Sequence, residues 1–523
     1  MKSLLLLLLT TSVLAAVAVD QLTVKTTTGI FTGLVDSDFL HVRQFRSIPY
    51  AQPPTGKRRW LPPVAVTPSA RRYYSYRFPP SCPQYQSRNL TAWNTNITDF
   101  SIRLYGQSYT AGTMAQTSSE DCLSLAIWAP FFPTNTNTTT NPKLPVGLFI
   151  PGGDFTAGGV DVPYQQPAPW VERSQQHIMV TANYRVNIAG FPWAAGLDEQ
   201  NLGIMDIRMA LEWVYTNIHS FGGDLERITL WGQSAGGVAV DIVQHAYYDE
   251  PLAAGLFMQS GTAMVNKTYP DPDHKNFTFV ARNLGCNFSD PVTEVDCMRQ
   301  VPMNLIQNFV GQYKDNNTKP TLIFKPIPDE KRVFLNYTER ALKGYIAKTP
   351  ALVSTTANEE STLYKYPTTN VTEGPWREGV DNATVSVFVC LTSNTTDARA
   401  RAGLTTYRYE YAGNFTNITP LWWMGAYHAS DIPMIFGTYV TQNKGEITDE
   451  QRRVAETMQD YAFAFLTDPQ NGLRLKGWMP HAGTVEQGGN MMLFASRGIV
   501  AQNASASMVD DACWKGVRYN SNP

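Results

Sequence analysis

Short, uninterrupted apolar runs are the feature that most constrains the fold of this 523-residue chain. Strands buried on both faces, as in a parallel sheet, are continuously apolar, whereas strands with one wet face alternate. Between the second and third runs lies a helix-like stretch, residues 204–218, with apolar residues three or four positions apart. The sequence therefore predicts an α/β fold with a mostly parallel central sheet flanked by helices. The runs are residues 144–150, 177–183, 228–231, 256–258 and 351–353.

The chain is expected to form a single large domain. A prior of about 150 residues per domain would suggest three, but no stretch of linker-like composition separates two halves. The one low-complexity stretch, residues 133–140, is polar and turn-prone and indicates an exposed loop instead.

The charge balance excludes a general nucleic-acid binder. Basic side chains number 42 and acidic ones 44, which gives a formal charge of -2. Aromatic residues make up 12% of the chain, and so much apolar surface requires burial in a folded core.

The N-terminus has the composition of a secretory signal peptide. One positive charge at Lys2 precedes the apolar run 4–9, and residues 16–18 fit an A-x-A cleavage site. The alternative is a membrane anchor, but the run is shorter than the roughly 20 residues that a span needs. We expect cleavage after Ala18, a secreted, soluble mature chain of residues 19–523, and no later transmembrane segment.

Sequons for N-linked glycosylation are dense, which agrees with secretion and predicts surface loops that carry glycans. They begin at Asn89, Asn96, Asn137, Asn266, Asn276, Asn287, Asn316, Asn336, Asn370, Asn382, Asn394, Asn414, Asn417 and Asn503.

The cysteine count is even, and disulfides are expected on an oxidising route. Six cysteines allow fifteen pairings, and their spacing does not choose among them. No Cys-x-x-Cys or His-x-x-x-His spacing exists, so no metal site is expected. The six are Cys82, Cys122, Cys286, Cys297, Cys390 and Cys513.

A single G-x-S-x-G motif, residues 232–236, makes Ser234 the candidate nucleophile. The apolar run 228–231 enters the motif and a helix-forming stretch follows, so the serine lies on a sharp strand-to-helix turn. The backbone N–H of Ala235 would face developing negative charge at the helix N-terminus. The alternative is a glycine-rich turn with an ordinary serine.

A serine hydroxyl needs a base, which is usually a histidine. In hydrolases with this motif the acid and then the histidine follow the serine, which leaves three candidates. His428 lies in an aromatic loop between small residues, His274 has the surroundings of a solvated surface residue, and His481 follows Trp478-Met479-Pro480. The residues favour His428 and keep His481 open.

Four further motifs show that the chain resembles the type-B carboxylesterases, which include cholinesterases and secreted fungal lipases. They are Glu120-Asp121-Cys122-Leu123-Ser124-Leu125, the stretch from Asn201-Leu202-Gly203 to Gly237, Phe45-Arg46-Ser47-Ile48-Pro49-Tyr50-Ala51, and Asn183-Tyr184-Arg185-Val186-Asn187. The resemblance covers about residues 20 to 515. It implies the α/β-hydrolase fold and assigns the base to His428.

The resemblance also implies a glutamate as the third catalytic residue, just after a strand. Glu359 and Glu360 both follow the run 351–353. Counting from the strand favours Glu359, whereas counting back from Thr362 favours Glu360. We select Glu359, because strand register fixes its side chain more firmly, and expect it to orient the histidine.

An oxyanion hole is implied at residues 151–155, where the family has a glycine triplet. The backbone N–H groups of Gly153 and Asp154 would join that of Ala235. The third glycine is Asp154 here, and we expect its carboxylate to turn away and bond nearby backbone. Gln233 replaces the glutamate that relatives carry, which removes a charge and should leave the chemistry untouched.

The family's disulfide pairing would be Cys82 with Cys122, Cys286 with Cys297, and Cys390 with Cys513. The first pair would close an aromatic loop containing Trp93 and Phe100, as well as Tyr105 and Tyr109. Such a loop is either a lid or wall over an apolar ester, or an ordinary surface loop.

These features together predict a secreted serine hydrolase of carboxylic esters that needs no cofactor or metal. Ser234, His428 and Glu359 would form its catalytic triad. The alternatives are a lipase or sterol esterase acting on long-chain esters, and a non-catalytic adhesion or binding protein of the same fold, such as the neuroligins. The expected partner is a small-molecule or lipid ester, and no nucleic acid.

Overall fold

The computed structural model describes residues 21–102, 111–132, 143–264, 271–441, 444–483 and 488–523. The expected signal peptide, the low-complexity stretch 133–140, Tyr105, Tyr109, and the sequons at Asn137 and Asn266 lie outside these residues.

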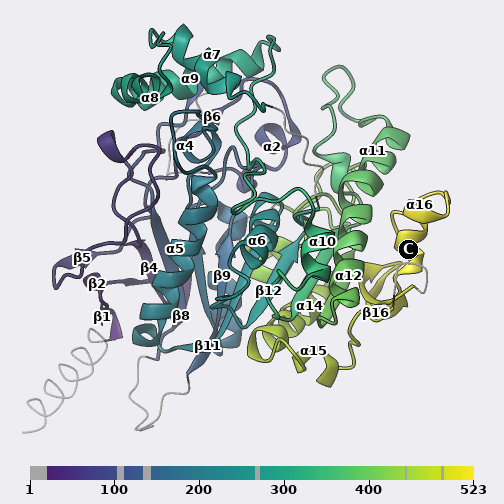
Figure 1. Ribbon diagram of the computed structural model, residues 1–523. Coiled ribbons are helices and arrows are strands. Elements are labelled where there is room, and N and C mark those ends of the chain that lie inside the picture. Colours follow the sequence, from purple (N-terminus) through teal and green to yellow (C-terminus); the bar gives the residue numbers. More distant parts are fainter. Residues whose placement is uncertain (1–20, 103–110, 133–142, 265–270, 442–443, 484–487) are drawn as a thin grey trace, which may run out of the picture.

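An eleven-stranded sheet runs through the centre of the molecule (Figure 1). Its seven inner strands, from β15 to β10, are mutually parallel, and antiparallel strands close both edges. In spatial order the strands are β16 (Ile499–Ser505), β15 (Asn490–Ser496), β14 (Thr406–Tyr411), β13 (Ala351–Thr356), β12 (Gly255–Gln259), β11 (Gly223–Gln233), β9 (Leu144–Ile150), β10 (Ile178–Ala182), β8 (Ser124–Pro130), β4 (Phe39–Pro49) and β3 (Leu34–Asp36).

The predicted strands are confirmed, since all five apolar runs lie in inner strands of this sheet. Strands β9, β10, β12 and β13 match their runs closely, whereas β11 begins at Gly223, five residues before the run starts at Ile228. Every residue of β10, β12 and β13 is buried, as expected for strands covered on both faces.

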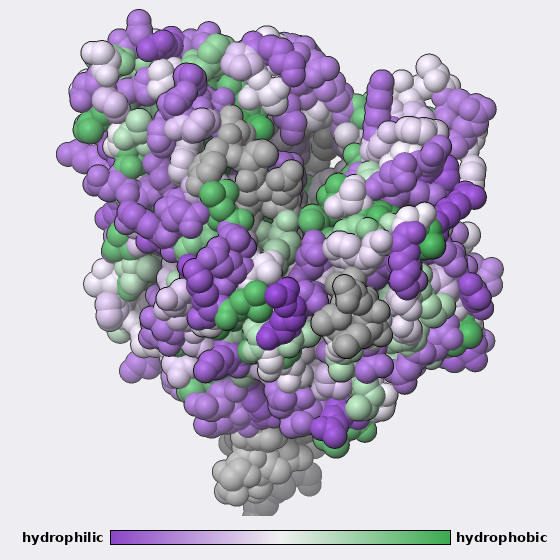
Figure 2. Space-filling view, turned by 45° about the vertical axis from the view of Figure 1, so that its right-hand side comes forward, coloured by the Kyte–Doolittle hydropathy of each residue, from purple (hydrophilic) through white to green (hydrophobic). Residues whose placement is uncertain are grey.

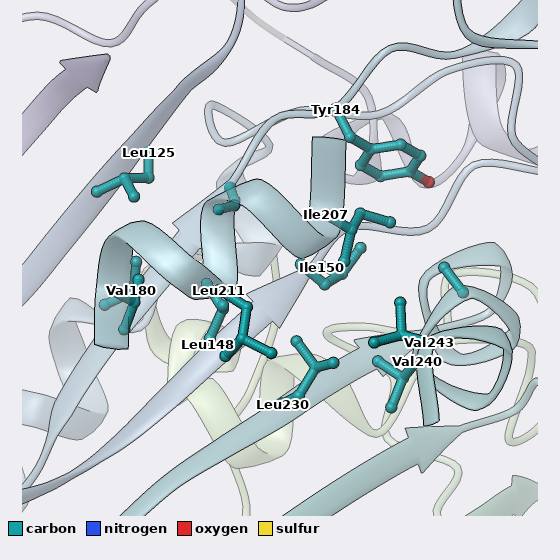
Figure 3. Packing of buried hydrophobic residues seen from close by; sticks show 14 of the residues in the cluster. Leu125, Leu148, Ile150, Val180, Tyr184, Ile207, Leu211, Leu230, Val240 and Val243 are labelled. Carbon is teal, nitrogen blue, oxygen red and sulfur yellow. The ribbon is translucent and has the colours of Figure 1, made fainter. Parts of the chain in front are cut away.

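Helices cover both faces of the sheet. Leu148 and Leu230 pack toward α5 and α6, where they meet Leu211 and Val240 (Figure 3). Their neighbours in the strands, such as Phe149 and Trp231, belong to a second core cluster together with residues of α3 and α14. Alternate side chains of a strand thus enter opposite layers, and burying each large one contributes about 1.5–3 kcal/mol.

The described helices are α2 (Ala92–Thr95), α3 (Ala168–Ser174), α4 (Asn187–Gly190), α5 (Leu202–Asn217), α6 (Ala235–Ala246), α7 (Lys275–Asn283), α8 (Pro291–Gln300), α9 (Met303–Asp315), α10 (Tyr337–Leu342), α11 (Arg377–Thr384), α12 (Cys390–Arg401), α13 (Ile432–Phe436), α14 (Asp449–Thr467), α15 (Gly472–Leu475) and α16 (Ser507–Trp514). Helices α7, α8 and α9 lie together at one end of the molecule (Figure 1). No helix in the described part of the chain is long and apolar enough to cross a membrane. Two small sheets complete the fold. The first contains β1 (Thr23–Lys25), β2 (Ile30–Thr32) and β5 (Arg72–Tyr74), and the second contains β6 (Tyr85–Gln86) and β7 (Thr113–Met114).

Three disulfides are formed, with the pairing that the family resemblance implies. Cys82 pairs with Cys122, Cys286 with Cys297, and Cys390 with Cys513. The last pair ties the first residue of α12 to α16 near the C-terminus.

The surface carries most of the described sequons. On the face shown in Figure 2, hydrophilic residues predominate and hydrophobic residues are scattered between them. Asn276 and Asn417 are buried, at 7% and 4% exposure, so the folded chain does not present them to a glycosylating enzyme. The other described sequon asparagines are exposed or half-buried.

The topology collects the candidate site at one edge of the sheet. The oxyanion loop follows β9, Ser234 follows β11, Glu359 follows β13, and the loop with His428 follows β14. These strands are parallel, so their carboxyl ends meet at the same edge, where open α/β sheets bind their ligands.

Candidate active site

Ser234 occupies a strained turn between β11 and α6. Its φ of 56° and ψ of -125° lie outside the regions that residues with a side chain usually adopt, which costs about 1–3 kcal/mol. The surrounding main chain packs closely enough to impose this conformation. A Cβ atom on Gly236 would lie 2.0 Å from the Ile150 carbonyl oxygen, and one on Gly261 would lie 2.2 Å from that of Ser234.

His428 and Glu359 form a buried pair. The imidazole Nδ1 lies 2.6 Å from Glu359 Oε2, and the two residues are 3% and 0% exposed. The other carboxylate oxygen, Oε1, accepts a hydrogen bond of 2.7 Å from the backbone N–H of Thr356. Glu359 is thereby fixed from both ends of its carboxylate, and it holds the proton of His428 on Nδ1.

The two loops that carry this pair are joined by Asn358. Its backbone N–H donates to the Ala426 carbonyl at 2.9 Å, and its side-chain amide donates to the carbonyls of Trp423 and Met424 at 3.0 and 2.6 Å. The residue before the acid therefore sets the position of the histidine loop.

The other candidate residues, His274, His481 and Glu360, take no part in the contact between His428 and Glu359. His274 is half-buried rather than solvated, since its ring stacks on Trp193 and its Nδ1 lies 3.0 Å from that residue's carbonyl oxygen. The ring of His481 contacts the Asn490 carbonyl at 3.2 Å. Glu360 makes no contact with His428 Nδ1, although burial raises the pKa of its carboxyl.

Gln233 contacts the other imidazole nitrogen, which bears on the expectation that it leaves the chemistry untouched. Its Nε2 lies 3.2 Å from Nε2 of His428, and the Gln233 side chain is buried. Because Nδ1 of His428 carries its proton toward Glu359, Nε2 is the acceptor and the amide of Gln233 donates to it. Nε2 is also the nitrogen that would take a serine proton, so Gln233 competes for its lone pair.

Backbone N–H groups lie beside Ser234 on the loop after β9. Gly153, Asp154 and Phe155 all have positive φ values, of 117°, 57° and 57°. No acceptor among the described residues is found for the N–H groups of Gly153 and Asp154. Ala235 is the first residue of α6, where an N–H has no partner within the helix.

The Asp154 carboxylate turns toward a lysine instead of the nearby backbone that we expected. Its Oδ1 lies 2.6 Å from Nζ of Lys325, and the side chains are 61% and 39% exposed. Asp154 also accepts the left-handed backbone that a glycine would take freely. The ion pair balances the charge that this substitution brings to the loop.

A cavity of about 830 Å³ is lined by Ser234, His428, Gln233 and the loop residues Gly153 and Asp154. This volume is typical of pockets that enclose a whole small-molecule ligand. The rest of the lining includes Trp93 and Phe100 of the Cys82–Cys122 loop. Two further segments contribute Ile323, Lys325, Pro326 and Ile327, and Val387, Phe388, Leu391 and Thr392. The described part of the disulfide loop is thus a wall of the cavity.

Two wall residues also hold the histidine ring. The ring of Phe388 lies 5.0 Å and that of Trp93 6.3 Å from the His428 ring, measured between centroids. Phe388 belongs to the π-helical turn η6 (Val385–Val389), a distortion that often marks functional sites. Neither Phe388 nor Lys325 belongs to a motif, so their presence in this cavity could not be predicted from the sequence.

Within the described ranges, no three His, Cys, Asp or Glu side chains are grouped closely enough to hold a metal ion.

The chain matches a single protein family along most of its length. The model of the carboxylesterase family matches residues 20–378 and 368–507. Chlorogenic acid esterase of Aspergillus niger is 38% identical over 508 residues, which cover 94% of this chain and 94% of the relative. Secreted lipase 5 of Gibberella zeae is 38% identical over 518 residues, with the same coverage of both chains. A secreted triacylglycerol lipase of Gibberella zeae is 27% identical over 527 residues, 88% of this chain and 85% of the relative.

The sheet and its helical layers define an α/β-hydrolase. The chain belongs to the carboxylesterase family, as its motifs predicted, and it is a carboxylic ester hydrolase.

Proposed function

We propose that the chain is a secreted serine esterase that works through Ser234, His428 and Glu359 and forms an acyl-enzyme. The observation that supports this most strongly is the buried 2.6 Å contact between His428 and Glu359, in a cavity that Ser234 also lines. A histidine oriented by a carboxylate, whose other nitrogen can take the proton of a serine, is the arrangement that activates a hydroxyl.

Acylation begins when Ser234 Oγ attacks the ester carbonyl carbon and His428 Nε2 takes the hydroxyl proton. Gln233 must release this nitrogen for the transfer to occur. Glu359 stabilises the imidazolium, and the backbone N–H groups of Gly153, Asp154 and Ala235 donate to the oxyanion. A single such donor contributes about 2.7–4 kcal/mol to the transition state.

The same groups complete acylation and then carry out deacylation. The tetrahedral intermediate collapses, the C–O bond to the alcohol breaks, and His428 gives its proton to the departing oxygen. His428 next takes a proton from water, and the resulting hydroxide attacks the acyl-enzyme. Collapse of the second intermediate releases the carboxylic acid and returns the proton to Ser234.

Secretion is part of the proposal and is supported by the N-terminal sequence, the disulfides and the surface sequons. Two of the relatives are named as secreted proteins. We expect N-linked glycans on the exposed sequons and none on Asn276 or Asn417. Treatment of the secreted protein with a peptide N-glycosidase, followed by peptide mass spectrometry, tests both points.

A lipase is the second candidate, because two relatives carry that name. A series of p-nitrophenyl esters of increasing acyl length, in solution and in emulsion, separates it from an esterase of soluble substrates. A preference for emulsified long-chain esters supports the lipase.

The nucleophile is tested with Ser234→Ala. We expect loss of all ester hydrolysis with an unchanged circular dichroism spectrum and melting temperature. An inhibitor with a fluorophosphonate group should label wild type at the peptide with Ser234 and leave the variant unlabelled. Retention of activity in the variant would refute the proposal.

A further inference from the structure

Glu360 is a carboxylate in the cavity wall with no partner of its own. It lines the same cavity as Ser234 and His428. Among the described residues, no hydrogen bond or ion pair to its carboxylate is found, although its neighbour Glu359 has two. Two consecutive glutamates thus serve different purposes, and the proposed mechanism uses only the first.

The main chain holds Glu360 firmly in this position. It lies in the short 3-10 helix η5 (Glu359–Ser361), and its N–H donates to Thr384 Oγ1 at 3.1 Å. Its carbonyl accepts hydrogen bonds from the N–H groups of Leu363 and Tyr364, at 3.1 and 2.8 Å. These hydrogen bonds fix the main chain of Glu360 and therefore the position of its side chain, as substrate recognition requires.

The surroundings of this carboxylate offer it little compensation. Leu363, Val387, Phe388 and Leu391 are the apolar residues of the adjoining wall. Burial raises the pKa of Glu360, which reports the cost of keeping a charge there. Glu360 is half-buried, so a ligand that fills the cavity can supply a hydrogen bond to its carboxylate.

Apart from His428, whose charge would favour the ionised carboxyl, the described lining residues bring no unpaired cation to Glu360. Lys325 is the one basic side chain among the described residues of the lining, apart from His428, and it is paired with Asp154. A partner must therefore arrive with the substrate, as either a hydroxyl group or a positively charged group.

The position next to His428 favours the hydroxyl. The imidazole of His428 becomes positively charged in the transition state, and a cation held at Glu360 would oppose that charge. A neutral hydroxyl donates to the carboxylate without this penalty. We infer that Glu360 is a specificity-determining residue that accepts a hydrogen bond from a hydroxyl group of the substrate, so that hydroxylated esters are the preferred substrate class. This inference rests on the proposed function.

Matched ester pairs test the inference on wild type, Glu360→Leu and Glu360→Gln. Methyl 4-hydroxycinnamate against methyl cinnamate places the hydroxyl on the acyl side, and glyceryl monobutyrate against propyl butyrate places it on the alcohol side. Butyrylcholine against 3,3-dimethylbutyl butyrate reports on a cation. The charge-matched control is Glu373→Gln, on the exposed surface and outside the cavity lining.

We expect wild type to favour the hydroxylated member of at least one pair, in kcat/KM. Glu360→Leu should reduce that preference about tenfold or more, and Glu360→Gln less, since its amide oxygen still accepts a hydrogen bond. Glu373→Gln should keep the preferences of wild type.

Two results overturn the inference. The first is that wild type shows no preference for the hydroxylated esters, or that Glu360→Leu shows the same preference as wild type. The other is a fall in the preference for butyrylcholine instead, which would assign Glu360 to a cationic substrate. Failure of the proposed function is distinguishable, since it would appear as hydrolysis that survives Ser234→Ala whatever the ester.

Discussion

The substitution Glu359→Gln should disable the candidate base while preserving the shape of the site. Glu359 accepts two hydrogen bonds, from His428 Nδ1 and from the backbone N–H of Thr356. Glutamine has only one side-chain oxygen, so it can satisfy one of these donors and turns its NH₂ group toward the other.

Either orientation is unfavourable. If the glutamine oxygen keeps the hydrogen bond from the Thr356 N–H, its NH₂ group faces Nδ1 of His428. The ring proton then moves to Nε2, and this nitrogen can no longer accept the serine proton. If the oxygen keeps His428, the NH₂ group opposes the Thr356 N–H at a site that is 0% exposed. Leaving a buried donor unpaired costs about 1–3 kcal/mol, so the productive tautomer falls to about one molecule in 5 to 150.

A second loss comes from the charge. A hydrogen bond to a charged group contributes about 1 kcal/mol or more beyond a neutral one, and the imidazolium of the transition state loses this support. Together the two effects predict a fall in kcat of about 10²- to 10³-fold, with a smaller change in KM.

The assay is hydrolysis of p-nitrophenyl butyrate, with the unfolding transition followed by circular dichroism. Glu410→Gln is the matched control, because Glu410 is equally buried but lies outside the cavity lining. The reasoning is refuted if Glu359→Gln stays within fivefold of wild type, or if the control loses as much. A greater loss in Glu360→Gln than in Glu359→Gln would transfer the role of the acid to Glu360.

Three further changes test other parts of the site and its support. Asp154→Gly keeps the backbone N–H and removes an exposed ion pair worth at most about 1 kcal/mol, so kcat should change by less than about fivefold; a rise of tenfold or more would show that the carboxylate opposes the oxyanion. Gln233→Glu places a charge near Nε2 of His428 and stabilises the imidazolium, so the acidic limb of the pH–rate profile should move to higher pH; a profile that coincides with that of wild type contradicts the contact. Burial raises the pKa of Glu410 to about 8, so its contribution to stability is complete below its unfolded pKa near 4.5 and is lost as the pH rises through about 8. Urea unfolding between pH 5 and 8 should therefore show wild type losing stability relative to Glu410→Gln, and a difference that is constant with pH would exclude this explanation.

The inner strands could be predicted because burial on both faces leaves an unmistakable apolar run. Strand β14 escaped prediction, since its sequence Thr-Tyr-Arg-Tyr-Glu-Tyr alternates in polarity although every residue is buried. Arg408 is paired there with Asp510, and Glu410 has a raised pKa. A local sequence pattern cannot predict an ion pair between residues that are so far apart in the chain.

The candidate site was predictable where a motif fixes the local geometry. The glycines around Ser234 predicted the turn, and the family resemblance predicted the loop that carries the histidine. The choice between Glu359 and Glu360 depended on one turn of η5, which the sequence does not determine. Lys325 and Phe388 reach the cavity from segments without any motif, so only the folded chain brings them to it.

The close packing of main chain around Ser234 has a consequence for how such an enzyme can diversify. A methyl group on Gly152 would meet the Gln233 carbonyl oxygen at 2.7 Å, and Gly236 and Gly261 have even less room. The proposed nucleophile thus lies among positions that tolerate no added atom, whereas Phe100, Val387 and Leu391 line the cavity with side chains that can be replaced. Laboratory libraries aimed at new esters should vary these lining positions and leave the glycines intact, because the glycine positions have no room for a side chain.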